Sequence, residues 1–301
     1  MKQFRRFAAA RLLPAFVLLP AVVLAAPITF NTALPIADGE FLFRQQFRWL
    51  RSSDDPTAQD REVRAHAALS VLGYGVNRDL AFFAVVPYID KTHEIGSASP
   101  TIKRGAAGVG DLSAFARYTF LQHNATARTS RLAAFGGLSA PTGDDDAHDN
   151  FGRLPPALQT GSGTWNFFGG LVATHQTLAY QLDGQLSYRE NRENRDFEAG
   201  DETRFDLSWQ HRLWPRKLDG GVPGFFYAVL ELNVLHRGKN RLAGVSDPDS
   251  GGDTVWLSPG LQYVTRRWIL ETVVQKPVSQ SLNGAALEND WIISAGFRVN
   301  F

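Results

Sequence analysis

The sequence predicts an all-β fold: a transmembrane antiparallel up-and-down β-barrel of about twelve strands, with long external loops and short periplasmic turns. Three observations lead to this prediction. The N-terminus has the composition of an export signal, segments of about ten residues alternate between apolar and polar side chains, and the connections between these segments alternate between long and short.

The first 25 residues are predicted to be a signal peptide. Its basic n-region, which contains no acidic residue, carries Lys2, Arg5, Arg6 and Arg11. The apolar run from Leu12 to Leu24 follows, and the small residue Ala25 fits a cleavage site. This run is shorter than the ~20 residues of a spanning helix, so a membrane anchor is the weaker interpretation. The mature chain would begin near Ala26 and form one barrel domain over residues 26–301.

The charge balance argues against a nucleic-acid partner. The chain has 31 basic and 30 acidic residues. Without the four basic residues of the signal, the mature chain has 27 basic and 30 acidic residues, which gives a net charge of −3. No basic field for phosphate is therefore expected. The chain has no Cys, so its stability cannot come from disulfides. After the signal no stretch has the ~20 apolar residues of a spanning helix, so a membrane-inserted form would have to be a closed barrel.

Twelve segments show the period-two alternation that is typical of strands, in which successive side chains point to opposite faces. They cover roughly residues 40–51, 62–75, 80–91, 109–120, 131–141, 163–175, 178–190, 203–213, 225–236, 254–264, 268–276 and 290–301. In the last one, Trp291, Phe297 and Phe301 share an apolar face, and Ser294 and Arg298 lie on the opposite face. Such faces match the lipid side and the lumen side of a membrane barrel.

The lengths of the connections provide independent support. After odd-numbered strands they are long, near 52–61, 92–108, 142–162, 191–202, 237–253 and 277–289. After even-numbered strands they are mostly short, at 76–79, 175–177 and 265–267, with longer exceptions near 121–130 and 214–224. Long external loops and short periplasmic turns are the pattern of outer-membrane barrels, whereas a soluble sandwich has no reason to alternate in this way.

Three glycine-rich motifs resemble those of a known family. They are Gly108-Val-Gly-Asp111 at the start of a strand, Gly137–Gly143 with its Pro-Thr-Gly end, and Gln159–Phe167 at the entry to the next strand. Together they are similar to the outer-membrane proteins of the "MetA-pathway of phenol degradation" family, often labelled transporters. The resemblance covers most of the mature chain. It implies a barrel in the outer membrane, carries over no catalytic residue and does not name the cargo.

Charged residues on the polar face are predicted to line a narrow pore, because Arg facing lipid at mid-depth would cost about 2–4 kcal/mol. The predicted pore-lining residues are Arg44, Arg48, Arg64, Asp111, Arg117, Asp183, Arg189, Arg204, Asp206, Arg212, Glu231, Glu271 and Arg298. Their basic excess favours anionic or polar solutes. The alternative is that these side chains cross-link strands and fill the lumen. Phe83, Phe115, Phe168, Tyr227 and Trp256 also point inward in this phase, where they could hold apolar cargo or pack the lumen.

No catalytic residue, cofactor or metal site is predicted. The weak metal candidate is the acidic cluster of Asp144, Asp145, Asp146 and Asp149, since hard cations prefer clustered carboxylates, but its spacing is not that of an EF-hand. No His spacing matches a zinc motif, and no G-x-S-x-G elbow is present. His211 falls on the apolar face of its strand near Trp209, where a position in an aromatic girdle is the better explanation.

The sequence favours a monomeric channel or transporter of the cell outer membrane that passes a small solute, aromatic or anionic in character, by passive diffusion. Two alternatives remain open: a lipid-modifying outer-membrane enzyme, based on His211 and plentiful Ser, and a structural or adhesive barrel whose external loops bind partners. An open lumen would favour transport, and a closed one would favour the alternatives.

The expected partners are outer-membrane lipid and lipopolysaccharide, the small solute and the barrel-insertion machinery. The resemblance to outer-membrane barrels implies that the terminal aromatic residue, Phe301, presents the closing strand to that machinery. Exposed aromatic side chains such as Trp49, Trp209 and Trp291 are predicted to anchor the barrel at the membrane interfaces.

Overall fold

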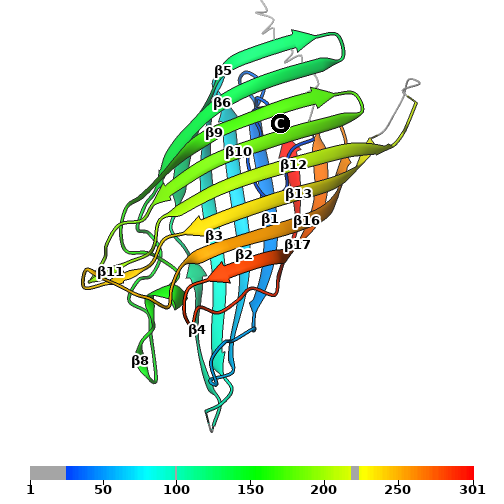
Figure 1. Ribbon diagram of the computed structural model, residues 1–301. Helices are drawn as coiled ribbons and strands as arrows, with labels where there is room; N and C mark the ends of the chain where they lie inside the picture. The colour runs from blue at the N-terminus through cyan, green and yellow to red at the C-terminus, as the bar shows by residue number, and fades with distance from the viewer. Residues whose placement is uncertain (1–24, 99, 218–223) are drawn as a thin grey trace, which may run out of the picture.

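The computed structural model describes residues 25–98, 100–217 and 224–301, and the predicted signal peptide, apart from Ala25, lies outside them. The described chain forms one closed antiparallel barrel (Figure 1), which confirms the predicted fold class. Its wall strands are β1 (Phe41–Ser52), β2 (Arg61–Gly75), β3 (Leu80–Ile95), β4 (Ile102–Val109) with β5 (Ser113–Ala125), β6 (Arg128–Ser139), β9 (Asn166–Thr177), β10 (Tyr180–Glu190), β12 (Glu202–Trp214), β13 (Phe225–Arg237), β16 (Gly252–Val264), β17 (Trp268–Leu282) and β18 (Trp291–Asn300).

The barrel has twelve wall strands because β4 and β5 are two parts of one. Both pair with β3, β4 through Tyr88↔Val109 and β5 through Val85↔Ser113. Every other wall strand pairs with its two neighbours in the chain, and β1 closes the barrel against β18 with Phe43 opposite Val299. A closed ladder leaves no sheet edge for lipid to satisfy.

The short elements lie in the long loops, at the end of the barrel away from the C-terminus (Figure 1). They are β7 (His148–Asp149), β8 (Gly152–Arg153), the 3₁₀-helix η1 (Pro156–Leu158), β11 (Phe197–Glu198), β14 (Arg241–Leu242) and β15 (Val245–Ser246). β11, β14 and β15 form a small sheet of their own. The described residues contain no helix with the length and apolar character needed to cross a bilayer.

Several strand boundaries differ from the sequence prediction. β3 and β17 run four and six residues past their predicted ends at 91 and 276, and β4 occupies part of the predicted loop 92–108. The long connection expected near 121–130 is wrong: β5 and β6 continue to Ala125 and from Arg128, and Ala127 makes the turn with a positive φ of 60°. Exposed, polar strand ends lack the apolar alternation from which the boundaries were predicted.

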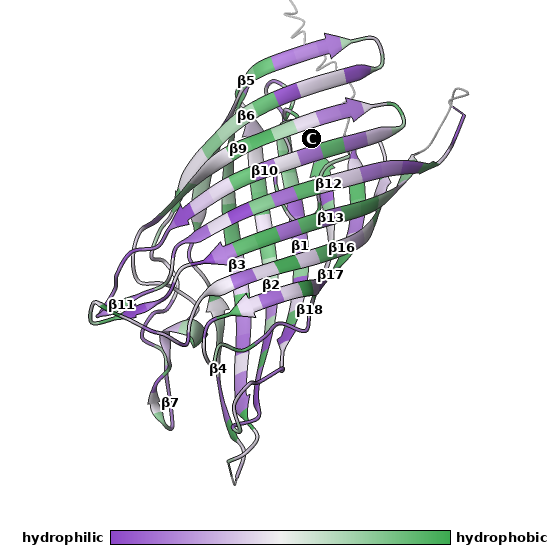
Figure 2. Cartoon of the chain, viewed as in Figure 1, coloured by the Kyte–Doolittle hydropathy of each residue, from purple (hydrophilic) through white to green (hydrophobic). Residues whose placement is uncertain are grey.

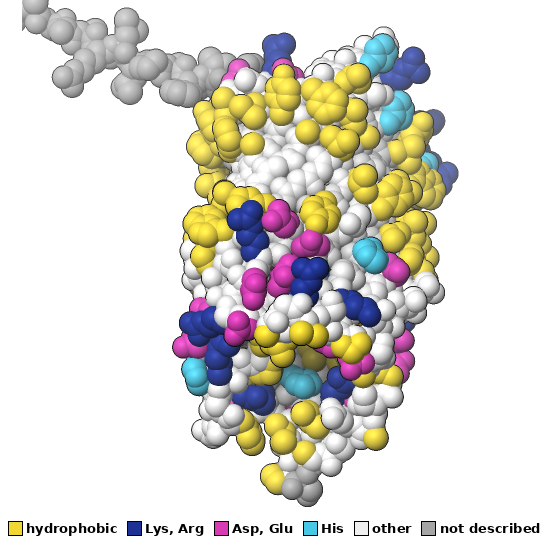
Figure 3. All heavy atoms as spheres, turned by 60° about the vertical axis from the view of Figure 1, so that its left-hand side comes forward, with side chains coloured by type: hydrophobic (Ala, Val, Ile, Leu, Met, Phe, Trp, Pro, Cys, Tyr) yellow, Lys and Arg dark blue, Asp and Glu magenta, His cyan; other side chains and the backbone are white. Residues whose placement is uncertain are grey.

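For most of the wall strands, the prediction of which side chains face outward and which face the lumen is correct. Large apolar side chains such as Phe47, Leu72, Leu182, Leu230 and Leu270 are exposed on the outside. The inner face carries buried polar residues, which produces the alternating colours along each strand in Figure 2. Figure 3 shows hydrophobic side chains over the upper part of the wall, with Lys, Arg, Asp and Glu gathered lower down, towards the long loops. This is the surface of a barrel with an apolar belt around it.

Candidate functional site

The lumen holds a segment of the chain itself, residues 25–37, here called the plug. Although it has no regular secondary structure, Ile28, Ala33 and Ile36 are at most 2% exposed. Ile28 packs on Val229 and Val273, at one side of the lumen. Further along the plug, Ala33 packs among residues of β6 and β9, and Ile36 among residues of β3. The plug therefore crosses the barrel interior from one wall to the other.

The backbone N–H groups of the plug are bound by side chains of the wall. The Glu231 carboxylate accepts hydrogen bonds from the N–H of Ile28 at 2.7 Å, the N–H of Thr29 at 3.2 Å and the Thr29 hydroxyl at 2.5 Å. Further along, the N–H of Ala33 donates to the Thr174 hydroxyl at 2.9 Å. Because the plug makes no strand ladder, these side chains satisfy buried donors that would otherwise be unpaired.

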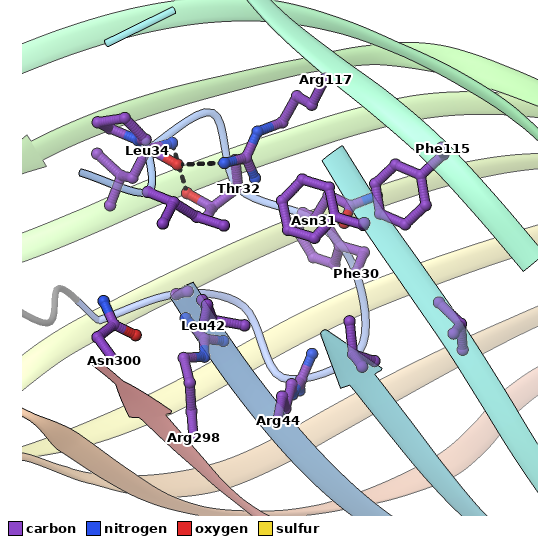
Figure 4. A pocket seen from close by; sticks show the side chains of 16 residues that line it. Phe30, Asn31, Thr32, Leu34, Leu42, Arg44, Phe115, Arg117, Arg298 and Asn300 are labelled. Carbon is purple, nitrogen blue, oxygen red and sulfur yellow. Dashed lines mark hydrogen bonds between the residues drawn. The ribbon is translucent and has the colours of Figure 1, made fainter. Parts of the chain in front are cut away.

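The carbonyl groups of the plug are bound by cations and amides. Arg117 donates to the carbonyls of Thr32 and Leu34 at 2.7 and 2.6 Å, as the dashed lines in Figure 4 show. Arg44 and Gln46 both donate to the carbonyl of Ile28, at 2.5 and 3.1 Å. Gln262 donates to the carbonyl of Ala26 at 2.6 Å. The inward polar side chains thus act as a fitted cradle for the plug.

Most residues that the sequence predicts to line a pore project from the inner face of the barrel. These are Arg44, Arg48, Arg117, Asp183, Arg189, Arg204, Asp206, Arg212, Glu231, Glu271 and Arg298. Many of them bind the plug or one another: Asp183 accepts hydrogen bonds from Thr32 and Thr174, and Arg204 pairs with Asp206 at 3.5 Å. The sequence could not show that a segment of the chain occupies the space between them.

The prediction for Arg64 is wrong. Val71 and Leu69 of β2 face the interior cavities, so by alternation the even-numbered residues of β2, Arg64 included, face outward. Its side chain is 52% exposed and pairs with Glu62 at 2.7 Å, beside Arg51 of β1. A charge is accommodated on this part of the outer face because Arg51 also pairs with Asp290 at 3.6 Å, so two cations meet two carboxylates near the loop end of the strand.

Asp111 is also not a residue of the strand wall, because residues 110–112 leave the ladder between β4 and β5. Its carboxylate accepts hydrogen bonds from the N–H of Gly143 at 3.0 Å and from the N–H and hydroxyl of Ser162 at 2.9 and 2.6 Å. Gly143 and Gly161 lie so close that a Cβ on Gly143 would be 2.6 Å from the Gly161 Cα. The three glycine-rich motifs therefore meet at one junction, which joins both ends of the long loop between β6 and β9 to the break in the wall.

The acidic cluster is held by arginines. Asp149 pairs with Arg104 at 2.7 Å, and Asp145 and Asp146 pair with Arg195 at 3.4 and 2.5 Å. The Arg104 guanidinium lowers the pKa of the Asp149 carboxyl. Asp144 accepts a hydrogen bond from the N–H of Asp146 at 2.8 Å. Within the described residues, no three His, Cys, Asp or Glu side chains gather as metal ligands.

His211 lies exposed on the outer face, 5.6 Å from the Trp209 ring. A Ser–His hydrogen bond joins two other residues instead, the Ser130 hydroxyl and His175 Nδ1 at 2.8 Å, which are cross-strand partners on β6 and β9. In the part of the chain that the structure describes, no carboxylate completes this pair to a triad. The pair is explained by strand register alone.

Two cavities lie beside the plug. The vestibule has a volume of about 720 Å³, lies on the long-loop side and is bordered among others by Arg48, Lys91 and Arg189. The inner pocket has a volume of about 200 Å³ and lies nearer the chain termini; Figure 4 shows Phe30 of the plug in it, with Phe115 and Arg298 of the wall. Val85 of β3 borders both cavities, so they adjoin along this wall.

The aromatic residues predicted to point inward do lie in the lumen. Phe83 and Phe115 are stacked with ring centroids 4.6 Å apart, and Phe168 meets Phe115 edge-on at 5.9 Å. Tyr227 packs beside Ala25 of the plug, and Trp256 is 5% exposed. The first three rings form a continuous aromatic strip, in which Phe83 and Phe115 border the inner pocket.

The family model described as "Putative MetA-pathway of phenol degradation" matches residues 59–278. Among solved structures, an outer-membrane channel from Pseudomonas putida F1 is similar over 91% of this chain and 100% of that chain, with 15% identity and a TM-score of 0.70. The β domain of the Bordetella autotransporter BrkA matches 88% of this chain and 100% of its own, with 10% identity and a TM-score of 0.46. No curated protein matches. The first likeness shows the same fold.

Proposed function

We propose that this chain, which belongs to the family described as "Putative MetA-pathway of phenol degradation", is an outer-membrane channel that passes a small solute by passive diffusion past the plug. One observation carries the proposal: Val85 borders both the vestibule and the inner pocket, so the two cavities adjoin each other. Together they make a path along β1, β2, β3 and β5, on one side of the plug. The barrel retains this space beside the plug.

The proposal includes the cellular location. An exported precursor would lose its signal near Ala26, and the single barrel domain of residues 26–301 would insert into the outer membrane. The exposed apolar belt supports contact with lipid and lipopolysaccharide. Phe301 is 60% exposed and stacks on Phe41 at 5.8 Å, so a terminal aromatic side chain is available to the insertion machinery.

The plug is compatible with transport because of how it is held. The plug is held to separate strands by hydrogen bonds and by apolar packing, and none of these contacts is covalent. A lumen filled by packed wall side chains would leave no comparable element to shift. The plug therefore narrows the path, and its displacement would widen it.

Planar-bilayer recordings of the purified protein test the proposal. The wild-type protein should show a small conductance, and deletion of residues 27–37 should raise the conductance several-fold while the barrel still migrates as a heat-modifiable band. Should the wild-type and deletion proteins both be folded yet pass no ions or solute, the channel function would be ruled out.

A structural or adhesive barrel is the second candidate. Apolar side chains are exposed at loop tips: Phe151 and Leu242 at 63% and Val245 at 71%. Leu242 and Val245 are cross-strand partners on β14 and β15, and adjoining exposed apolar side chains are a feature of interaction surfaces. A folded plug-deleted barrel without solute flux, whose attachment to surfaces depends on these three residues, would favour this candidate.

A further inference from the structure

The inner pocket has an apolar wall made by the aromatic strip and the plug. Phe83 and Phe115 lie stacked at an interplanar angle of 8°, and Phe30 reaches the same space from the plug (Figure 4). A cavity of about 150 Å³ with an apolar lining can hold benzene. The inner pocket, at about 200 Å³, therefore has room for one substituted aromatic ring.

The opposite side of the pocket carries a buried cation that forms no ion pair. Arg298 is 8% exposed, its Nε has no hydrogen-bond partner, and no carboxylate of the described residues lies within 4 Å of it. Burial of a charge is costly unless the charge is paired. A ligand anion would supply the missing partner.

The cross-strand register makes this imbalance sharper. Arg298 lies directly opposite Arg44 on the inner face, and like charges in this position repel each other. Arg44 is neutralised by Glu271 at 2.5 Å and also donates to the plug. Arg117, on the far side of the pocket, donates to two plug carbonyls. Arg298 is thus the cation of the pocket with an unused donor and no ion pair.

The approach from outside has matching chemistry. Six Lys or Arg side chains border the vestibule against three Asp or Glu, and Asp111 is bound to the loop junction. The Arg189 guanidinium lies 5.6 Å from the centroid of the Phe168 ring, at the vestibule end of the aromatic strip. A basic vestibule attracts anions, and the aromatic strip offers a contact surface for the ring of an aromatic anion.

We propose that the inner pocket binds the anion of a small aromatic acid, with its ring against Phe30, Phe83 and Phe115 and its carboxylate on Arg298. The inference rests on the proposed channel function, because it names the class of solute that the channel takes. Neutral aromatic compounds lack a group for Arg298, and small anions such as acetate lack a ring for the apolar wall.

Calorimetric titration of the folded protein with benzoate, toluene and acetate tests this assignment. Benzoate should bind at least about tenfold more tightly than either of the others, since each of them loses one of the two contacts. Arg298→Gln should weaken benzoate binding by about tenfold or more, with toluene binding unchanged. Arg298→Lys, which keeps the charge, should restore part of the affinity. Arg204→Gln, which removes an inward arginine outside the pocket, should have no effect.

Equal binding of benzoate and toluene would overturn the inference, and so would a benzoate affinity that Arg298→Gln leaves unchanged. Bilayer conductance is measured on the same preparations. Conductance without benzoate selectivity would refute the solute class alone, whereas a folded protein without any conductance would refute the channel function. If Arg298→Gln does not fold, the ranking of the three ligands on the wild-type protein still decides.

Discussion

Glu231→Gln should release one end of the plug. The carboxylate of Glu231 is fully buried and accepts three hydrogen bonds from Ile28 and Thr29. Glutamine keeps one acceptor oxygen, but it puts an amide N–H₂ group where the second oxygen was. At least one of the three bonds is therefore lost, and a donor of the plug then faces another donor.

The size of the effect follows from these contacts. A hydrogen bond to a charged group contributes about 1.5–3 kcal/mol, and a buried donor left without a partner costs about 1–3 kcal/mol. A net loss of about 3 kcal/mol would shift the equilibrium between docked and released plug by roughly 150-fold. If the plug narrows the conducting path, this shift should be visible in single channels.

Single-channel recording in planar bilayers is the assay. Glu231→Gln should show frequent openings to a larger conductance that the wild-type protein rarely visits. Thr29→Val, which removes only the hydroxyl bond, should have a smaller effect, and little should be added in the double variant because both changes act on one contact. Glu190→Gln, on an exposed residue of β10 paired with Arg192, is the control. If folded Glu231→Gln channels behave as the wild type does, the plug is not held at this point or does not narrow the path.

Three further predictions concern the loops and the closing strand. Asp111→Ala removes three hydrogen bonds that hold both ends of the loop of residues 140–165 to the break at residues 110–112, so limited proteolysis should cut this loop severalfold faster, and unchanged cleavage would refute the junction. Phe301→Ser should lower the heat-modifiable, membrane-inserted fraction without changing the conductance of channels that do insert; normal insertion would argue against its role. The Arg61 guanidinium holds the pKa of the Asp55 carboxyl well below its usual range, so this loop contact is complete above about pH 4 and is lost only in stronger acid. Cleavage of residues 53–60 should then stay constant from pH 8 to 5, whereas Asp55→Asn should raise it throughout that range.

The barrel was predictable because its two faces have different solvents. Phe297 and Arg298 are neighbours in the chain but face lipid and lumen, and that contrast repeats every second residue through most wall strands. The rule failed at Arg64, since the outer face near the loops no longer contacts an apolar medium. Strand phase can therefore be assigned from sequence within the apolar belt, but not beyond it.

The plug and the junction depend on contacts that leave no local pattern. Ile28 and Glu231 are 203 residues apart, and residues 25–37, with two prolines and no periodicity, have the composition of a linker. The strand predicted over 109–120 contains the break at residues 110–112, because Gly and Asp in a strand indicate a bulge only when their partners are known. The motifs that identified the family therefore predicted neither the plug nor the anchoring role of Asp111.

The division of charge in the lumen connects the plug to the solute path. Plug N–H groups are bound by acceptors on β9, β10 and β13, and its carbonyls mainly by donors on β1 and β5. Acceptors on one wall and donors on the other therefore hold the plug between them. The inner pocket is bordered by Arg44, Arg117 and Arg298. Arg44 and Arg117 already donate hydrogen bonds to carbonyl groups of the plug. The arrangement that holds the plug thus also leaves one basic site for an anion beside it.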